Sequence, residues 1–393
     1  MCAAFQELVS IMRSLDAFAA GKLAELDQRH QRRTLVPTAR LDGAWLERGG
    51  RRLVSFSCND YLNFASHPQV KAAAIRAVEQ HGAGAGASRL VTGNHPLIEE
   101  LEARLARLKG TEAACVFGSG YLANLGIIPV LVGRDGLVIV DELAHNCINA
   151  GAQMAPGRAL TFRHNDLSHL REILAAERGN YTHVLVVTDG VFSMDGDLAP
   201  LKAMGELCAE YDAWLMSDDA HGIGVIGGGR GSVHVGEGAA AVPLQMGTLS
   251  KAIGSYGAYL CASKPVIDLM KTRSRTLVYS TGLPPAAIGA AIEALNIIES
   301  EPELIARPVE KARRFTRALN MAPAESPIVP IILGAETRAL EAQRVLAEAG
   351  YLVSAIRPPT VPAGTSRLRF AFSAAIEDAD IDAVAALLRE KIL

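Results

Sequence analysis

The sequence predicts an α/β fold built on a mostly parallel β-sheet flanked by helices, with a smaller α+β domain after it. Short apolar, β-branched runs alternate with segments whose apolar residues recur at helical spacing. This order is typical of parallel sheets covered on both faces. From Pro284 onward two long helical patterns come first and short strands follow, so a second domain is expected there.

Three regions are expected along the chain. Residues 1–49 form a helical segment, because residues 5–29 have amphipathic spacing. Residues 50–282 form the large domain and residues 283–393 the C-terminal domain. The predicted strands are 114–117, 137–140, 183–188, 213–217, 242–246 and 257–261, then 328–334, 352–356 and 367–373. The predicted helices are 68–80, 96–109, 122–131, 167–177 and 199–210, then 285–299, 302–319, 336–348 and 376–392.

Composition limits the possible partners. The chain has 393 residues, 49% of them hydrophobic, and a net charge of −3, which gives no support to nucleic acid or an anionic membrane as a partner. Apolar runs such as 125–132 are far shorter than the roughly 18–20 residues that span a bilayer. The N-terminus lacks a signal-peptide layout. The six cysteines are scattered without a Cys-x-x-Cys pair, so we expect free thiols, a cytoplasmic protein and no metal site.

Polar residues follow four of the predicted strands. Because ligands bind beyond the carboxyl ends of parallel strands, these residues are expected to converge. They are Asp141, Glu142 and His145, then Asp189 and Ser193, then Asp218, Asp219 and His221, then Thr248 and Lys251.

Lys251 is the most informative of them. It lies in Gly247–Gly254, among small and hydroxylated residues, with no acidic partner at helical spacing. An amine in a partly dehydrated niche has a lowered pKa and can act as a nucleophile. The alternative is a loop lysine in water.

Two glycine-rich segments are candidate phosphate sites. Gly222–Gly227 matches the dinucleotide pattern G-x-G-x-x-G, but Gly228–Gly231 follows and cannot form the required helix. By contrast, Gly118–Tyr121 precedes a helical pattern, so its backbone N–H groups could hold a phosphate. A plain N-cap by Ser119 is the alternative.

The remaining candidates complete one cofactor site. Asp218 could pair with a protonated pyridine nitrogen, although an Asx turn is the alternative. His145 could cover the ring or be a structural histidine. Arg357 and Arg369 lie in strand patterns and could bind a carboxylate, or could form structural ion pairs. An amine, an acid, an imidazole and a phosphate site together indicate pyridoxal 5′-phosphate (PLP).

The chain resembles the α-oxoamine synthases, fold-type-I PLP enzymes that condense an amino acid with an acyl thioester and release CO2. The resemblance runs from about residue 50 to the C-terminus. It is carried by 56–62, 86–93, 119–124, 190–197, 218–222 and 248–251. Aminotransferases of this fold usually have an arginine soon after the lysine, and 252–259 contain none. Segments 94–97 and 356–362 are most similar to the biotin-pathway member, which joins L-alanine to a pimeloyl thioester held by CoA or a carrier protein.

The resemblance implies roles for individual residues. Lys251 would link covalently to the cofactor, Asp218 would hold the ring nitrogen, and His145 would stack on the ring. His221 and Ser193 would contact the ring hydroxyl region. Phosphate would be held by Gly120, Tyr121 and Thr248, and by Ser280 and Thr281 of a neighbouring subunit in a homodimer. Substrate would be bound by Asn59, Arg357, Thr360, Arg369 and an N-terminal arginine, for which Arg33 and Arg32 are the candidates.

Three positions depart from the family pattern. Asp189 stands where glutamate is usual, Ile98 where histidine is common, and Cys147 where serine is usual. They leave the acyl donor open, so glycine C-acetyltransferase, 5-aminolevulinate synthase and serine palmitoyltransferase types remain alternatives. A catalytically silent PLP-binding protein is a further one.

Overall fold

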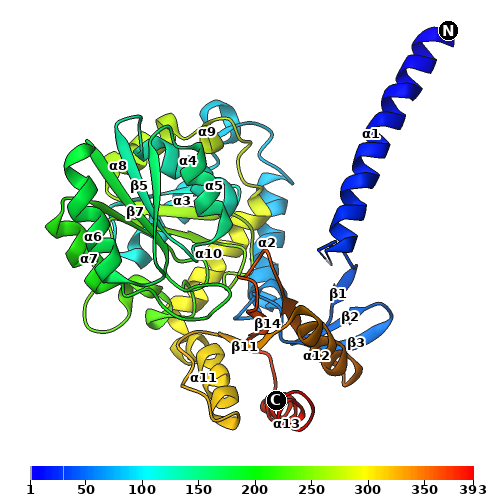
Figure 1. The fold of residues 1–393 in the computed structure, drawn as a ribbon. Helices are drawn as coiled ribbons and strands as arrows, with labels where there is room; N and C mark the ends of the chain where they lie inside the picture. The colour runs from blue at the N-terminus through cyan, green and yellow to red at the C-terminus, as the bar shows by residue number, and fades with distance from the viewer. Residues whose placement is uncertain (1, 30) are drawn as a thin grey trace.

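The computed structural model describes the backbone of residues 2–29 and 31–393, and side chains from residue 13 onward except at residue 30. Met1 and His30, which belong to the predicted N-terminal segment, lie outside the described residues, as does the side chain of Cys2. Helix α1 (Cys2–Gln28) confirms the predicted N-terminal helix and stands away from the rest of the chain (Figure 1).

A seven-stranded sheet forms the centre of the large unit, in the order β4-β10-β9-β8-β7-β5-β6. Strands β9, β8, β7, β5 and β6 run parallel to one another, while β10 is antiparallel to both β4 and β9. A mostly parallel sheet is therefore confirmed. Its strands are β4 (Ala113–Phe117), β5 (Gly136–Asp141), β6 (Arg158–Phe162), β7 (His183–Asp189), β8 (Trp214–Asp218), β9 (Leu244–Thr248) and β10 (Ala258–Ala262).

Helices cover both faces of this sheet (Figure 1). In β5, Val138 and Val140 pack with α4 (Gly120–Leu131) and α5 (Asn146–Met154). The alternate residues Leu137 and Ile139 pack in a different core cluster, with α6 (Leu167–Glu177) and α7 (Leu201–Glu210). Successive side chains of a strand point to opposite faces. Burial on both faces therefore explains why this strand reads as an unbroken apolar run.

A further cluster joins α2 (Pro68–His81), α3 (Pro96–Lys109) and α10 (Pro285–Ser300). Helices α8 (Lys264–Arg273) and α9 (Arg275–Val278) follow the last strand of the large sheet. The segment 222–231 contains only the short 3-10 turn Gly227–Gly229. This confirms that its glycine pattern does not open a dinucleotide-binding helix.

The C-terminal part has its own three-stranded sheet, in the order β11-β14-β13. Its strands are β11 (Ile328–Gly334), β13 (Ser354–Ile356) and β14 (Ser366–Ala371), and its helices are α11 (Pro302–Ala318), α12 (Glu336–Glu348) and α13 (Asp378–Lys391). The single strand predicted over 352–356 is in fact two strands. The first, β12 (Tyr351–Leu352), pairs in parallel with β3 (Arg51–Ser55) in another sheet, which also contains β1 (Thr38–Arg40) and β2 (Trp45–Arg48).

Candidate active site

Four neighbouring parallel strands end in polar residues at one edge of the sheet. The last residues of β5, β7, β8 and β9 are Asp141, Asp189, Asp218 and Thr248. In the pairing register, Asp189 lies opposite Asp218. Each strand end is followed three or four residues later by another candidate: His145, Ser193, His221 and Lys251. The polar residues therefore converge as expected, because the pairing register of these strands brings their carboxyl ends together.

Lys251 lies within this edge. It is partly buried, and its Nζ is 2.8 Å from Nε2 of His221. Burial lowers the pKa of Lys251 to about 8, although the carboxylates of Asp218 and Asp189 oppose this shift. The interpretation as a fully solvated loop lysine is therefore wrong. An amine with such a pKa is partly unprotonated near neutral pH.

His221 connects Lys251 to the predicted substrate-binding residues. Its Nδ1 is 2.6 Å from Oη of Tyr61. The Tyr61 hydroxyl in turn donates to Oδ1 of Asn59 over 3.4 Å, and Arg369 donates to the same oxygen over 3.1 Å. Burial lowers the pKa of His221 well below its ordinary value, and the charges of Lys251 and Arg369 add to this effect. His221 is therefore a neutral imidazole at neutral pH.

Asp218 is buried, and only 3% of the residue's surface is exposed. Its Oδ1 accepts the backbone N–H of Ala220 over 3.0 Å, which is the Asx turn considered above. Its Oδ2 accepts Nδ2 of Asn124 over 2.8 Å. The turn and a role at the cofactor are compatible, because each carboxylate oxygen can accept more than one hydrogen bond.

His145 is the N-cap residue of α5 and is exposed. Its backbone N–H donates to Oδ2 of Asp189 over 2.7 Å, and its Nδ1 accepts the backbone N–H of Cys147 over 3.2 Å. Burial of part of the ring lowers its pKa; Asp218 opposes the shift and Lys251 adds to it. Burial and the neighbouring Asp218 raise the pKa of Asp189 well above its ordinary value.

Three of the predicted phosphate residues, Gly120, Tyr121 and Thr248, lie at or beside the start of α4. Ser119 caps the helix by accepting the N–H of Leu122 over 3.3 Å, so the N-cap prediction is confirmed. A Cβ added to Gly120 would lie 3.9 Å from Cβ of Thr248, which places the helix start beside the end of β9. The first N–H groups of a helix have no partner within it. Ser280 and Thr281 line a separate small pocket with Arg89 and Gly118.

The structure also joins distant parts of the predicted substrate site. Arg33 donates to Oγ1 of Thr360 over 3.3 Å, whereas Arg32 pairs with Asp27 at 2.8 Å. Arg369, 6% exposed in β14, donates through Nε to the carbonyl of Ser193. Arg357 directly follows β13.

Sequence reasoning did not assign a role to Tyr61, Asn124 or His164. Asn124 lies one helical turn after Gly120 on α4, and that spacing is a signal that could have identified it. Tyr61 carried no such signal, because its contact with His221 spans 160 positions.

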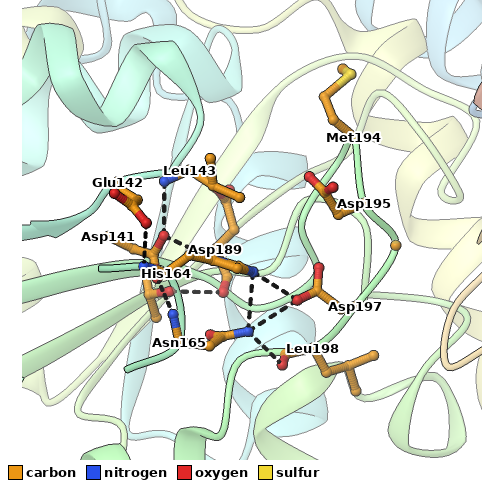
Figure 2. Close-up of polar contacts among 12 residues, drawn as sticks. Asp141, Glu142, Leu143, His164, Asn165, Asp189, Met194, Asp195, Asp197 and Leu198 are labelled. Carbon is orange, nitrogen blue, oxygen red and sulfur yellow. Dashed lines mark hydrogen bonds and ion pairs between the residues drawn. The ribbon is translucent and has the colours of Figure 1, made fainter. Parts of the chain in front are cut away.

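His164 belongs to a polar cluster beside the site (Figure 2). Its ring nitrogens lie 3.1 Å from Oδ1 of Asp141 and 2.8 Å from Oδ2 of Asp197. Burial lowers the pKa of His164, but these hydrogen bonds outweigh burial and raise the pKa to about 10. The backbone N–H of Leu143 also donates to Asp141. The cluster therefore ties the segment leading to His145 to the loop that carries Ser193.

The described residues fit PLP. A primary amine, a buried carboxylate and a helix N-terminus are the groups that its aldehyde, ring nitrogen and phosphate require, and Lys251, Asp218 and Gly120 supply them from neighbouring strand ends. In the described part of the chain, no group of three or more His, Cys, Asp or Glu side chains could hold a metal ion.

Comparisons with known proteins identify the family of this chain. The class I and II aminotransferase family matches residues 51–388. The chain is 62% identical to an 8-amino-7-oxononanoate synthase of Beijerinckia indica over 97% of this chain and 100% of the relative. It is 66% identical to one of Methylocella silvestris over 87% of this chain and 98% of the relative.

Solved structures show the same fold. A serine palmitoyltransferase of S. paucimobilis with bound PLP–myriocin aldimine is 28% identical, with a TM-score of 0.89 over 96% of this chain and 97% of the other. An 8-amino-7-oxononanoate synthase from Francisella tularensis is 23% identical, with a TM-score of 0.74 over 86% of this chain and 98% of the other; that likeness concerns the fold alone. The chain therefore belongs to the class I and II aminotransferase family, as a PLP-dependent enzyme of fold type I that groups with the 8-amino-7-oxononanoate synthases.

Proposed function

We propose that this enzyme condenses L-alanine with a pimeloyl thioester and releases CO2 and the thiol carrier, giving 8-amino-7-oxononanoate for biotin synthesis. The observation that carries the proposal is the high identity to 8-amino-7-oxononanoate synthases along almost the whole chain, together with the buried amine beside His221. A silent PLP-binding protein is disfavoured, because Lys251, Asp218, His221 and His145 are all present at one sheet edge.

PLP supplies an aldehyde that captures amines and a protonated ring that accepts the electron pair released at the substrate α-carbon. Lys251 provides the amine for that aldehyde. When it is free, its pKa of about 8 lets a useful fraction of Nζ accept the α-proton of alanine. The neutral His221, 2.8 Å away, holds Nζ in place without adding a second positive charge.

Asp218 would place its carboxylate at the ring nitrogen. Its two hydrogen-bond donors, Asn124 and Ala220, fix the orientation of the carboxylate. His145 would cover the ring face. Ser193 and His221 would contact the ring hydroxyl region, and Gly120, Tyr121 and Thr248 would hold the phosphate.

The substrate carboxylates are bound by arginines. Arg369 is oriented by Asn59 and the carbonyl of Ser193, and a guanidinium held in this way suits the bidentate binding of the alanine carboxylate. Arg33 and Thr360 meet at the surface and, with Arg357, bind the acyl substrate.

The active unit is a cytoplasmic homodimer, in which Ser280 and Thr281 complete the phosphate site of the other subunit. Exposed apolar side chains near these segments support this arrangement: Leu90 is 65%, Val91 74% and Tyr279 80% exposed in the single chain. Patches of this kind are typical of subunit interfaces. In the described part of the chain, no helix is both long and apolar enough to cross a membrane.

A panel of substrates tests the proposed function. Purified holoenzyme is mixed with L-alanine, glycine or L-serine, each with acetyl-, succinyl-, pimeloyl- or palmitoyl-CoA, and thiol release is followed. The proposal predicts the highest kcat/KM for L-alanine with pimeloyl-CoA, with 8-amino-7-oxononanoate identified by mass. A higher value for any other pair would assign the enzyme to a sibling reaction.

A further inference from the structure

Cys147 joins the two groups that flank the predicted cofactor ring. It is the second residue of α5 and is 3% exposed. Its Sγ lies 2.8 Å from Nδ1 of His145 and 3.1 Å from Nδ2 of Asn124. The same Asn124 nitrogen lies 2.8 Å from Oδ2 of Asp218. One thiol therefore connects the imidazole to the buried carboxylate through a single amide.

The hydrogen atoms in this series of hydrogen bonds, from Asp218 through Asn124 and Cys147 to His145, can be assigned. An amide nitrogen has two hydrogens and only donates. Asn124 gives one to Asp218 and the other to the nearer of two sulfurs, Sγ of Cys147 at 3.1 Å and not Sδ of Met246 at 4.0 Å. Burial and the neighbouring Asp218 raise the pKa of Cys147 to about 12, which leaves the thiol protonated at neutral pH. Its own hydrogen then has Nδ1 of His145 as its acceptor.

The backbone N–H of Cys147 also donates to Nδ1 of His145 over 3.2 Å and shares the single lone pair of this nitrogen with the thiol. A ring nitrogen that accepts carries no proton, so the imidazole proton must be on Nε2. Protonating Nδ1 would break the hydrogen bond from the backbone N–H and would force the thiol to accept instead of donate. The thiol, as a donor to Nδ1, therefore favours the neutral ring.

We propose that Cys147 is a positioning residue whose thiol holds His145 neutral, with its proton on Nε2, through the connection Asp218–Asn124–Cys147–His145. This inference rests on the proposed function, because it deepens the role of the same site. This arrangement gives His145 one fixed donor, Nε2–H, and keeps Nδ1 from taking up a proton.

The test follows His145 directly, by NMR of holoenzyme that carries 15N-labelled histidine rings. The signal of His145 is the one lost in His145→Gln. In Cys147→Ala the thiol donor is gone, and the titration midpoint of His145 should rise by about one pH unit. Cys147→Val, which fills the space without donating, should give the same rise, and Cys147→Ser should return the midpoint towards wild type.

The matched control is Cys208→Ala, which removes another buried thiol, on α7 in a different core cluster, and should leave the midpoint unchanged. An unchanged midpoint in both Cys147→Ala and Cys147→Val would overturn the proposal. Equal shifts in the serine, alanine and valine variants would also overturn it, because volume and not the donor would then be responsible. Thiol release from pimeloyl-CoA by wild type is measured separately, so failure of the proposed function is distinguishable from failure of this inference.

Discussion

Nζ of Lys251 lies 2.8 Å from Nε2 of His221, whose Nδ1 lies 2.6 Å from Oη of Tyr61. Because burial lowers the pKa of His221 well below its ordinary value, the ring is neutral and can accept from Lys251 while donating to Tyr61. The Tyr61 hydroxyl then donates to Asn59, which also holds Arg369. The amine and the predicted carboxylate-binding arginine therefore share one hydrogen-bonded chain.

Asp218→Asn should slow the reaction while leaving PLP bound. An amide cannot hold a negative charge against the ring nitrogen, and losing one such electrostatic contact lowers kcat on the order of 100-fold. Cofactor content is measured by absorbance and kcat by thiol release. The control is Asp212→Asn, whose side chain is 89% exposed. A kcat for Asp218→Asn within about twofold of wild type would be incompatible with the role given to this carboxylate.

The two N-terminal arginines should behave differently. Arg33 reaches Thr360, whereas Arg32 is paired with Asp27. Arg33→Gln should raise KM for pimeloyl-CoA about 10-fold with little change in kcat, because it removes binding common to ground and transition states. Arg32→Gln is the matched control and should change neither value. If Arg32→Gln instead raises KM, the substrate contact belongs to Arg32.

The ion pair between Lys109 and Asp219 should be essential for stability. Its atoms lie 2.8 Å apart, and both side chains are fully buried. Lys109→Met leaves Asp219 charged and unpaired, which should lower the free energy of unfolding by about 3–5 kcal/mol. Arg171→Ala, which breaks an exposed pair with Glu210, should cost much less, because solvent screens exposed ion pairs. Urea unfolding of the two variants compares them, and equal losses would contradict the importance of burial.

Stability should depend on pH through His164. The pKa of this imidazole is raised to about 10 in the folded protein, above the ordinary value of about 6.5. Its contribution is therefore fully present below about pH 6.5 and is lost as the pH rises through about 10. The difference in Tm between wild type and His164→Asn should shrink across this window. His183→Asn, which changes an exposed histidine, should show no such trend, and a constant difference for His164→Asn would contradict the assignment.

Much of the fold could be predicted from the sequence, because many of its helices and strands have strong local patterns. The predicted helices 96–109, 167–177 and 336–348 match α3, α6 and α12 to the residue, since each has apolar residues at helical spacing between clear boundaries. Strands β1 and β2 were missed because they are short and largely exposed, so they lack the apolar runs that mark buried strands. The split of 352–356 into β12 and β13 depends on pairing with β3, a contact made far away in the sequence.

The site was predictable to the extent that it follows strand ends. Asp218, Thr248 and Lys251 were identifiable because polar residues follow apolar strands there. The partners that orient them were not, since Asn124 and Tyr61 reach Asp218 and His221 across 94 and 160 positions. The division into residues 1–49, 50–282 and 283–393 remains a prediction. Helix α10 packs against α2, so contacts cross the proposed boundary between residues 282 and 283.

The most direct measurement of the central claim is exchange of the L-alanine α-proton in D2O. If Nζ of Lys251 takes this proton, holoenzyme should exchange the α-proton for deuterium in the absence of any acyl thioester, as followed by proton NMR. In Lys251→Ala, with PLP added back, the exchange rate should fall at least about 1,000-fold. Exchange by Lys251→Ala at the wild-type rate would contradict the account.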